Sequence, residues 1–125
     1  MGACTFVRSA GSDADKAEFS MNAPSGNGQA YRGVRGVLTP SNTYATGGDT
    51  IPLASVGLAN IYEMLVDPVG QTDAQQGLSY KLGGTPSAPT LMAFKSDATG
   101  AGAGSQVAAG IDIDAHSVTV LLLGV

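Results

Sequence analysis

The fold is decided by residues 44–58, YATGGDTIPLASVGL, where two adjacent glycines precede a short apolar segment. A Gly-rich loop before a helix can hold a phosphate, whereas the same residues before a strand form a turn. A phosphate-binding loop needs Lys and then Ser or Thr after the glycines, but Asp49 follows here, and Pro52 interrupts the segment beyond. The carboxylate of Asp49 also repels a phosphate. The sequence therefore predicts that Gly47 and Gly48 bend the backbone between two extended segments.

On both sides of this turn, apolar and polar residues alternate with the period of two that is typical of β-strands. Residues 60–68 are expected to form a central strand, with Tyr62, Met64 and Val66 on one face and Ile61 on the other. Residues 54–60 (ASVGLAN) are expected to form a single helical or 3₁₀ turn that ends at Gly57. The expected strands are residues 30–40 (AYRGVRGVLTP), 49–55 (DTIPLAS), 60–68 (NIYEMLVDP), 78–84 (LSYKLGG), 91–95 within SAPTLMAFKSD, 106–108 and 117–125 (SVTVLLLGV). Short strands with almost no helix predict an antiparallel β-sandwich or a jelly-roll-like barrel.

The composition narrows the class of protein. The chain has 125 residues, the size of one ordinary domain, and only 13% of them are charged, against about a quarter in an average domain. A weakly charged surface suits a protein that lies against other proteins, although a loop-rich β domain has a similar composition. The formal net charge of -4 argues against a nucleic-acid partner, which needs a basic surface. Without a signal-peptide pattern or an apolar run of ~20 residues, we expect a soluble chain with no membrane partner.

The N-terminal segment differs from the rest. Residues 1–29 are mostly small and polar, so we expect an extended N-terminal arm with little core of its own, followed by a β-sandwich domain at residues 30–125. Such an arm is either a frayed terminus or a segment that becomes ordered against a neighbouring subunit. Its apolar residues Phe6, Phe19 and Met21 are the candidates for that contact.

Candidate chemical groups are few. Asp112, Asp114 and His116 lie two residues apart, so they share one face if the segment is a strand, and together they can hold a divalent cation in a small metal-dependent enzyme. An exposed acidic stretch is the simpler interpretation, because no specific fourth ligand is evident. The single cysteine, Cys4, excludes an intrachain disulfide, and its place in the arm makes a Cys–His pair unpromising. We therefore predict no catalytic, cofactor-binding or metal-binding residues, and no enzymatic activity.

Residues 31–66, YRGVRGVLTPSNTYATGGDTIPLASVGLANIYEMLV, resemble a segment of small structural proteins of tailed bacteriophages. The resemblance lies in a strand, a Tyr-x-Thr-Gly-Gly-Asp turn at Tyr44 to Asp49, a short Leu/Pro strand and a Gly-Leu turn before the next strand. The sparse charge and the C-terminal VTVLLLGV are similar to capsid decoration, or cement, proteins. Residues 1–29 depart from the shorter versions of this pattern.

The resemblance implies a non-enzymatic virion protein. Such a protein is made in the host cytoplasm, binds the outer surface of the phage head and clamps adjacent subunits of the major capsid protein, often as a trimer. We expect Arg32, Arg35 and Tyr44 to join the arm residues in these contacts, with the two arginines as a local basic patch. The alternative is a tail, fibre or host-adhesion β-module that binds glycans through exposed tyrosines, for which Tyr44 and Tyr80 are the candidates.

Overall fold

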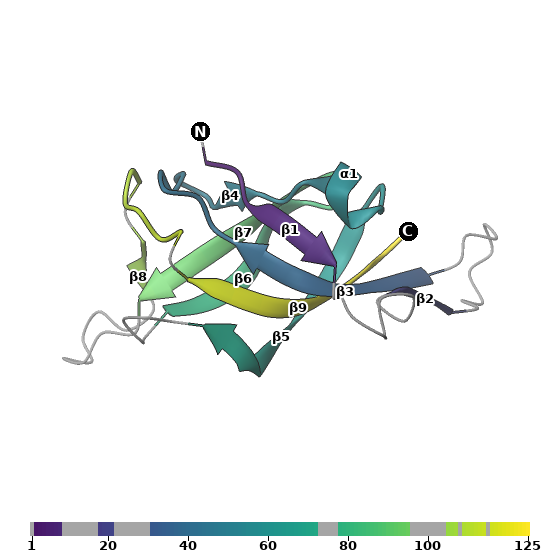
Figure 1. Cartoon of the computed structure of the whole chain (residues 1–125). Helices are drawn as coiled ribbons and strands as arrows, with labels where there is room; N and C mark the ends of the chain where they lie inside the picture. Colours follow the sequence, from purple (N-terminus) through teal and green to yellow (C-terminus); the bar gives the residue numbers. More distant parts are fainter. Residues whose placement is uncertain are drawn as a thin grey trace.

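The computed structural model of the chain describes residues 2–8, 18–21, 31–72, 78–95, 105–107, 109–114 and 116–125, with the side chains of 18–21, 67–72 and 105 left aside (Figure 1). Its elements are β1 (Thr5–Arg8), β2 (Glu18–Met21), β3 (Tyr31–Thr39), β4 (Asp49–Thr50), α1 (Leu53–Val56), β5 (Ile61–Thr72), β6 (Leu78–Thr85), β7 (Ala88–Lys95), β8 (Ser105–Gln106) and β9 (Ser117–Gly124). Within the described ranges, no helix is long and apolar enough to cross a membrane.

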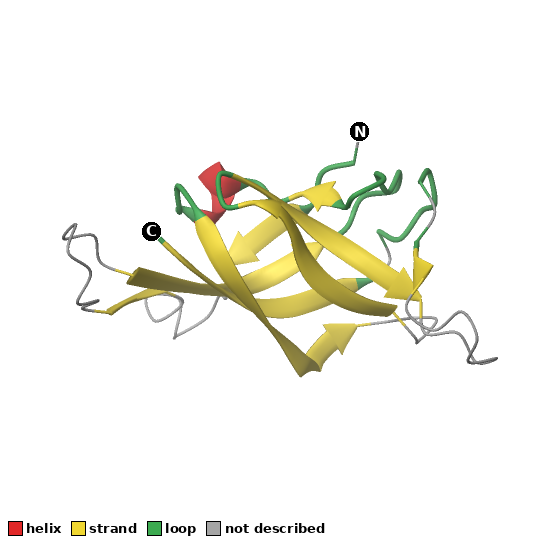
Figure 2. Cartoon of the chain, turned by 180° about the vertical axis from the view of Figure 1, so that it is seen from behind, coloured by secondary structure: helices red, strands yellow, loops and turns green. Residues whose placement is uncertain are grey.

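The strands form two antiparallel sheets. The five-stranded sheet has the order β1-β3-β9-β5, and β2 pairs with the same strand, β3, as β1 does. Because β1 pairs with residues 36–39 of β3 and β2 with residues 31–34, these two short strands follow each other along one edge. The four-stranded sheet has the order β4-β7-β6, with β8 also on β7. Figures 1 and 2 show the two sheets one behind the other. The predicted all-β class is confirmed, and the jelly-roll-like barrel stays a prediction.

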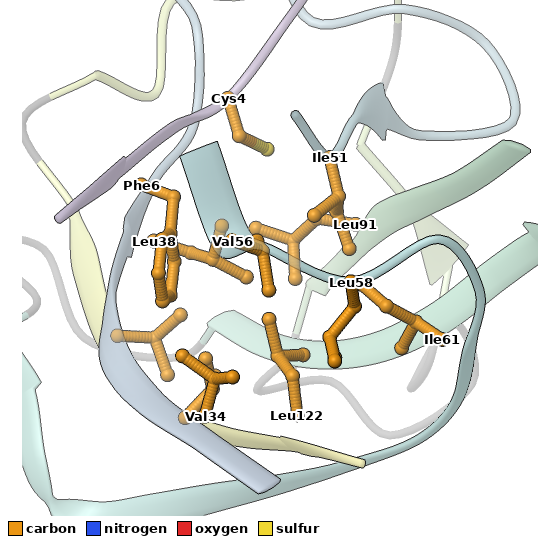
Figure 3. Close-up of a cluster of buried hydrophobic side chains, with 12 residues drawn as sticks. Cys4, Phe6, Val34, Leu38, Ile51, Val56, Leu58, Ile61, Leu91 and Leu122 are labelled. Atoms are coloured by element: carbon orange, nitrogen blue, oxygen red, sulfur yellow. The ribbon is translucent and has the colours of Figure 1, made fainter. Parts of the chain in front are cut away.

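The hydrophobic core lies between the sheets. Val34 and Leu38 of β3 and Leu122 of β9 point inward from the five-stranded sheet, and Leu91 of β7 meets them from the four-stranded sheet (Figure 3). All four side chains are at most 1% exposed. In β6, Leu78, Tyr80 and Leu82 share one face and pack against the buried clusters. Strand alternation thus places one apolar row of each sheet in the shared core.

The helical turn predicted around Gly57 is confirmed. Helix α1 ends at Gly57, which has the left-handed φ of 88° and donates its N–H to the carbonyl of Leu53. Glycine adopts this conformation without the steric cost that a Cβ adds. The chain then turns inward, so that Leu58 is buried beside Val56 in the core.

Strand β5 corrects two predictions. It lies at the end of the five-stranded sheet, whereas β9 lies between β3 and β5, so residues 60–68 do not form a central strand. The pairing with β9 also shifts between Ile61 and Glu63. A shift of one residue exchanges the two faces of a strand. Ile61 is therefore 1% exposed and joins Met64 on the core side, whereas Tyr62 is 43% exposed.

The first residues of the chain belong to the body of the domain. Residue Ala3 forms a parallel bridge with Thr50, and the N–H of Cys4 donates to the carbonyl of Thr50 at 2.9 Å, before β1 joins the five-stranded sheet. Cys4 and Phe6 lie in the core, contrary to the expectation that the segment before residue 30 has little core of its own. The physical reason is alternation: the inward residues of CTFV, Cys4 and Phe6, are apolar and join the core cluster that contains Leu38. The extended arm therefore does not include residues 2–8.

Candidate interaction surface

The turn with paired glycines holds a buried carboxylate. Gly47 and Gly48 have φ values of 89° and 104°, which confirms that they bend the backbone. Directly after them, the Asp49 side chain is fully buried and accepts hydrogen bonds from the backbone N–H groups of Ser41 at 2.7 Å and Ala45 at 3.0 Å. The carboxylate thus closes the loop from residue 41 to residue 49, as a structural group of the turn.

Tyr44 lies inside the domain. Its side chain is 1% exposed, and its hydroxyl oxygen accepts hydrogen bonds from the N–H of Ala93 at 2.9 Å and from Nε2 of Gln106 at 2.8 Å. Its backbone is also bonded, because the N–H donates to Ile111 and the carbonyl accepts from Gly110. The sequence placed Tyr44 among the contact residues, but in the folded chain its side chain joins the loops to β7 and β8.

The acidic segment before β9 forms a turn. Asp112 and Asp114 are exposed, whereas His116 is 5% exposed and donates its backbone N–H to the carbonyl of Ile113 at 3.1 Å. The Asp112 carboxylate accepts the backbone N–H of Asp114 at 3.0 Å. A hydrogen bond between the two side chains, and after it the charge of Asp112, raises the pKa of the Asp114 carboxyl. Because the segment is not a strand, the three groups do not share a face. Among the described residues, no three His, Cys, Asp or Glu side chains gather in a way that could hold a metal ion.

The thiol of Cys4 is a core group. Burial, and after it the charge of Asp49, raises the pKa of Cys4 from 9.0 to about 12. Its Sγ lies 3.8 Å from the carbonyl oxygen of Asp49, to which it donates a weak hydrogen bond. A thiol reacts through its ionised form, so Cys4 is inert at neutral pH in the folded chain.

The two arginines proposed as a basic patch point to opposite faces of β3. Arg32 lies two residues before the inward Val34 and therefore on the same face of the strand, and its guanidinium donates to the carbonyl of Gly57 at 3.0 Å. Arg35 follows Val34 directly, so it lies on the other face of the strand, the outer one, and is exposed. Arg8 of β1 also donates to the end of α1, at the carbonyl of Val56, at 3.1 Å. Arg32 and Arg8 therefore hold α1 against the sheet, and only Arg35 belongs to the outer face.

The other predicted contact residues have separate positions. Phe6 is 8% exposed and packs in the core of its own chain. Phe19 and Met21 lie in β2, opposite Gly33 and Tyr31 in the register, and their side chains lie outside the described residues. The structure does not bring the six predicted contact residues together on one surface.

The surface that sequence reasoning missed is the outer face of the five-stranded sheet, called the apolar face below. Three of its side chains are large, apolar and exposed: Val7 at 63%, Leu65 at 54% and Tyr62 at 43%. The same face carries the half-buried apolar residues Val37, Leu121 and Leu123, and among them the polar residues Arg35, Glu63 and Thr119. Large apolar side chains gathered on an exposed face are the usual character of a surface that contacts another molecule, so this face is the candidate interaction surface of the described residues.

Beside this face, Tyr62 contributes to two further features. Its ring lies 5.8 Å from that of Tyr31, with the two planes tilted by 41°. A shallow hollow of about 140 Å³ lies next to it and is lined by residues of β5, β6 and the β6–β7 turn: Ile61, Tyr62, Leu82, Gly83, Gly84, Thr85 and Pro86. The hollow has room for a single side chain or a small ring, and its lining residues carry no ionisable carboxylate, imidazole, amine or thiol.

Comparisons of the chain with protein-family models, with curated proteins and with solved structures found no match.

Proposed function

We propose that the chain is a virion structural protein: a capsid decoration, or cement, subunit that binds the outside of a tailed-phage head and clamps adjacent major capsid protein subunits. The resemblance of residues 31–66 supports this class of protein. Within that segment, the expected turn at Gly47 and Gly48 and the expected helical turn at Gly57 are both present.

The observation that carries the proposal is the apolar face. A chain that transforms a ligand needs ionisable groups that converge on a cavity. Here the buried polar groups of Asp49 and Tyr44 hold loops together, and the exposed apolar side chains lie on a broad sheet. Such an arrangement fits a protein that acts by covering its neighbours. On an icosahedral shell, many weak contacts of this kind add up through avidity.

Binding to heads tests this proposal. The purified chain is titrated onto isolated heads that lack it, and bound protein is measured by co-sedimentation, with an acidic globular protein of similar size as the control for adsorption. We expect saturation at a fixed number of copies per capsomer and a higher temperature of head rupture. Heads that take up no more of the chain than of the control protein would refute the proposal.

A host-adhesion module of the tail or fibre is a second candidate, and the Tyr31–Tyr62 pair beside the hollow favours it. Paired tyrosine rings next to a depression can stack on a sugar. In this case the chain binds host cells or glycans, and Tyr62→Ala abolishes that binding. A chain that binds neither cells nor glycans excludes this candidate.

A further inference from the structure

The two sheets meet along two sides, and only one of these sides is closed. At the closed side, Thr50 of β4 donates its N–H to the carbonyl of Gly2 at 3.1 Å and accepts the N–H of Cys4 at 2.9 Å, just before β1. The Cys4 side chain there is 4% exposed. At the other side, β5 and β6 are the last strands of the two sheets. Between the sheets at this side, the described residues form one backbone hydrogen bond, from the N–H of Ile61 to the carbonyl of Pro86 at 2.9 Å.

Beyond that bond, the hydrophobic core is incompletely covered. Inward side chains of the inner strands, such as Leu91 of β7 and Leu122 of β9, are at most 1% exposed. Inward side chains of the two end strands pack against the same core but are only half-buried. They line the region called the open seam below: Met64 and Val66 of β5 and Tyr80 and Leu82 of β6. Because burial of apolar surface is favourable, a further chain segment that covers the open seam is stabilised there.

The backbone of β5 is also open on the side away from β9. Asn60 and Val125 exchange two backbone hydrogen bonds of 3.1 Å each, so the N–H and C=O groups of Val125 point toward β5 and its N-terminal flank. Backbone groups of an antiparallel strand alternate in direction, and β9 pairs with β3 without a shift. The backbone groups of Leu123 and Leu121 therefore point toward β5 as well.

The residues of β5 opposite these two leucines bond to β9, and the residues that alternate with them do not. Glu63 and Leu65 are the partners of the leucines in the register. Met64 and Val66 alternate with them, so their N–H and C=O groups point away from β9. Within the described ranges, no strand pairs with β5 on that side. Such a row of backbone groups is a template for a further strand.

Two irregularities limit the length of this free edge. The pairing of β5 with β9 shifts between Ile61 and Glu63 and again between Asp67 and Thr72. Such shifts twist a strand and prevent it from accepting a long partner. The regular part, residues 63–67, spans about 16 Å at about 3.3 Å per residue. The free edge thus fits a short extended segment.

The charge of β5 defines the partner further. Residues 61–72 include two acidic residues, Glu63 and Asp67, and no Lys or Arg. The Glu63 side chain is exposed. In an added strand, the residue opposite Glu63 lies on the same face, with about 5 Å between the Cβ atoms, where a basic residue is favourable and an acidic one is unfavourable. The next residue of that strand faces the open seam, which an apolar side chain covers.

We infer that the free edge of β5 takes up an extended segment of a partner protein, in which apolar residues alternate with polar ones and a basic residue lies opposite Glu63. The added strand extends the five-stranded sheet, as in other cases of β-strand addition, and its inward side chains cover the open seam. One of them enters the hollow beside Ile61 and Leu82. The inference deepens the proposed function, and it rests on that function only for the source of the segment, a capsid subunit.

Amide hydrogen exchange of the isotope-labelled full chain, followed by NMR, tests the free edge first. In the chain alone, we expect the amides of Met64 and Val66 to exchange at least roughly 10-fold faster than those of Glu63 and Leu65, which bond to β9. The chain is then titrated with the acetylated and amidated peptide LKVTVKL. Because its sequence is a palindrome, it presents the same residues to β5 as a parallel or as an antiparallel strand. At about ten times its dissociation constant, the peptide is expected to slow exchange at Met64 and Val66 by roughly 10-fold.

Matched peptides and variants test the backbone pairing and the charge. The peptide LKVPVKL has the same charge, but its central proline lacks an N–H and interrupts strand pairing, so we expect it to leave exchange unchanged. Glu63→Lys is expected to weaken binding of LKVTVKL by roughly 3- to 10-fold and to strengthen binding of LEVTVEL. Asp112→Lys makes the same change of charge in the exposed turn before β9, and we expect it to alter neither.

Equal exchange at Met64 and Glu63 in the chain alone, no protection by LKVTVKL, or equal protection by LKVPVKL would overturn the inference. Equal effects of Glu63→Lys and Asp112→Lys would overturn the basic character of the partner. The two proposals fail separately. A chain that saturates heads but gains no protection from the peptide keeps the decoration role and loses the strand addition. A chain that the peptide protects along β5 but that binds no heads keeps the strand addition and loses the decoration role.

Discussion

Replacing Asp49 by Asn removes a charge from the most deeply buried polar site in the described part of the chain. The Asp49 carboxylate is 0% exposed and accepts two backbone N–H groups, from Ser41 and Ala45. An amide has one oxygen, so one of these N–H groups faces an NH₂ group and loses its acceptor. A hydrogen bond to a charged group contributes about 1.5–3 kcal/mol, and an unsatisfied buried donor costs about 1–3 kcal/mol. We expect Asp49→Asn to lower the free energy of unfolding by about 3 kcal/mol.

Denaturant unfolding followed by far-UV circular dichroism measures this change, because the chain contains no Trp for fluorescence. For a domain of this size, a loss of about 3 kcal/mol lowers the melting temperature by roughly 10 °C. Asp112→Asn is the matched control: its carboxylate also accepts one backbone N–H, that of Asp114, but is exposed to water. We expect a change below about 0.5 kcal/mol there. Equal, small effects of the two substitutions would refute the structural role of Asp49.

Three further predictions concern the turn, the loop anchor and the core thiol. Gly48→Ala forces a Cβ to within 2.8 Å of a neighbouring backbone oxygen at a φ of 104°, so we expect a loss of about 2 kcal/mol or more by denaturant unfolding. Gly47→Ala meets open space and should cost only about 1 kcal/mol, and the reverse order would contradict the turn geometry. Tyr44→Phe deletes the acceptor of two hydrogen bonds and should cost about 1–3 kcal/mol in the same assay, against almost nothing for the exposed Tyr62→Phe. The folded chain keeps the Cys4 thiol protonated up to a pKa of about 12, whereas the unfolded thiol ionises near 9.0, so folding stability falls as pH rises between these values, by up to about 1.4 kcal/mol per pH unit. Unfolding curves of wild type and Cys4→Val between pH 8 and 10.5 should diverge with this slope, and parallel curves would disprove it.

Local sequence patterns predicted where the strands and turns lie better than they predicted which strands pair with one another. The alternation in residues 30–40 and 78–84 correctly predicted strands β3 and β6, and Gly57 ends the helical turn as expected. The alternation in residues 60–68 predicted a strand but not its bulge, because the shift at Ile61 depends on pairing with β9, far along the chain. The same limit applies to the position of β5 at the end of the sheet.

Two buried groups illustrate what sequence reasoning missed. The alternation of Cys4 and Phe6 in CTFV was a signal for a strand, but the polar residues that follow obscured it. Tyr44 lies in a loop among turn residues, so the local sequence carried no sign that its side chain is buried. Its burial depends on hydrogen bonds from Ala93 of β7 and Gln106 of β8, which are distant in sequence.

The apolar face could not be predicted from local patterns for a related reason. Its residues belong to strands that are distant in sequence, and only the strand order β1-β3-β9-β5 brings them together. Within β9, the run VTVLLLGV places apolar residues on both faces, and the structure shows one buried and one half-buried face. The excess of apolar residues in this strand was thus the one available signal for an apolar outer surface.

The most direct test of the account is an image of the intact virion by electron microscopy, at a resolution that separates subunits. The account predicts density for a two-sheet domain at fixed positions on the outer surface of the head, with each copy touching more than one capsid subunit. Density for this chain on the tail or a fibre, or a particle without it, would contradict the central claim that the protein works by covering the shell.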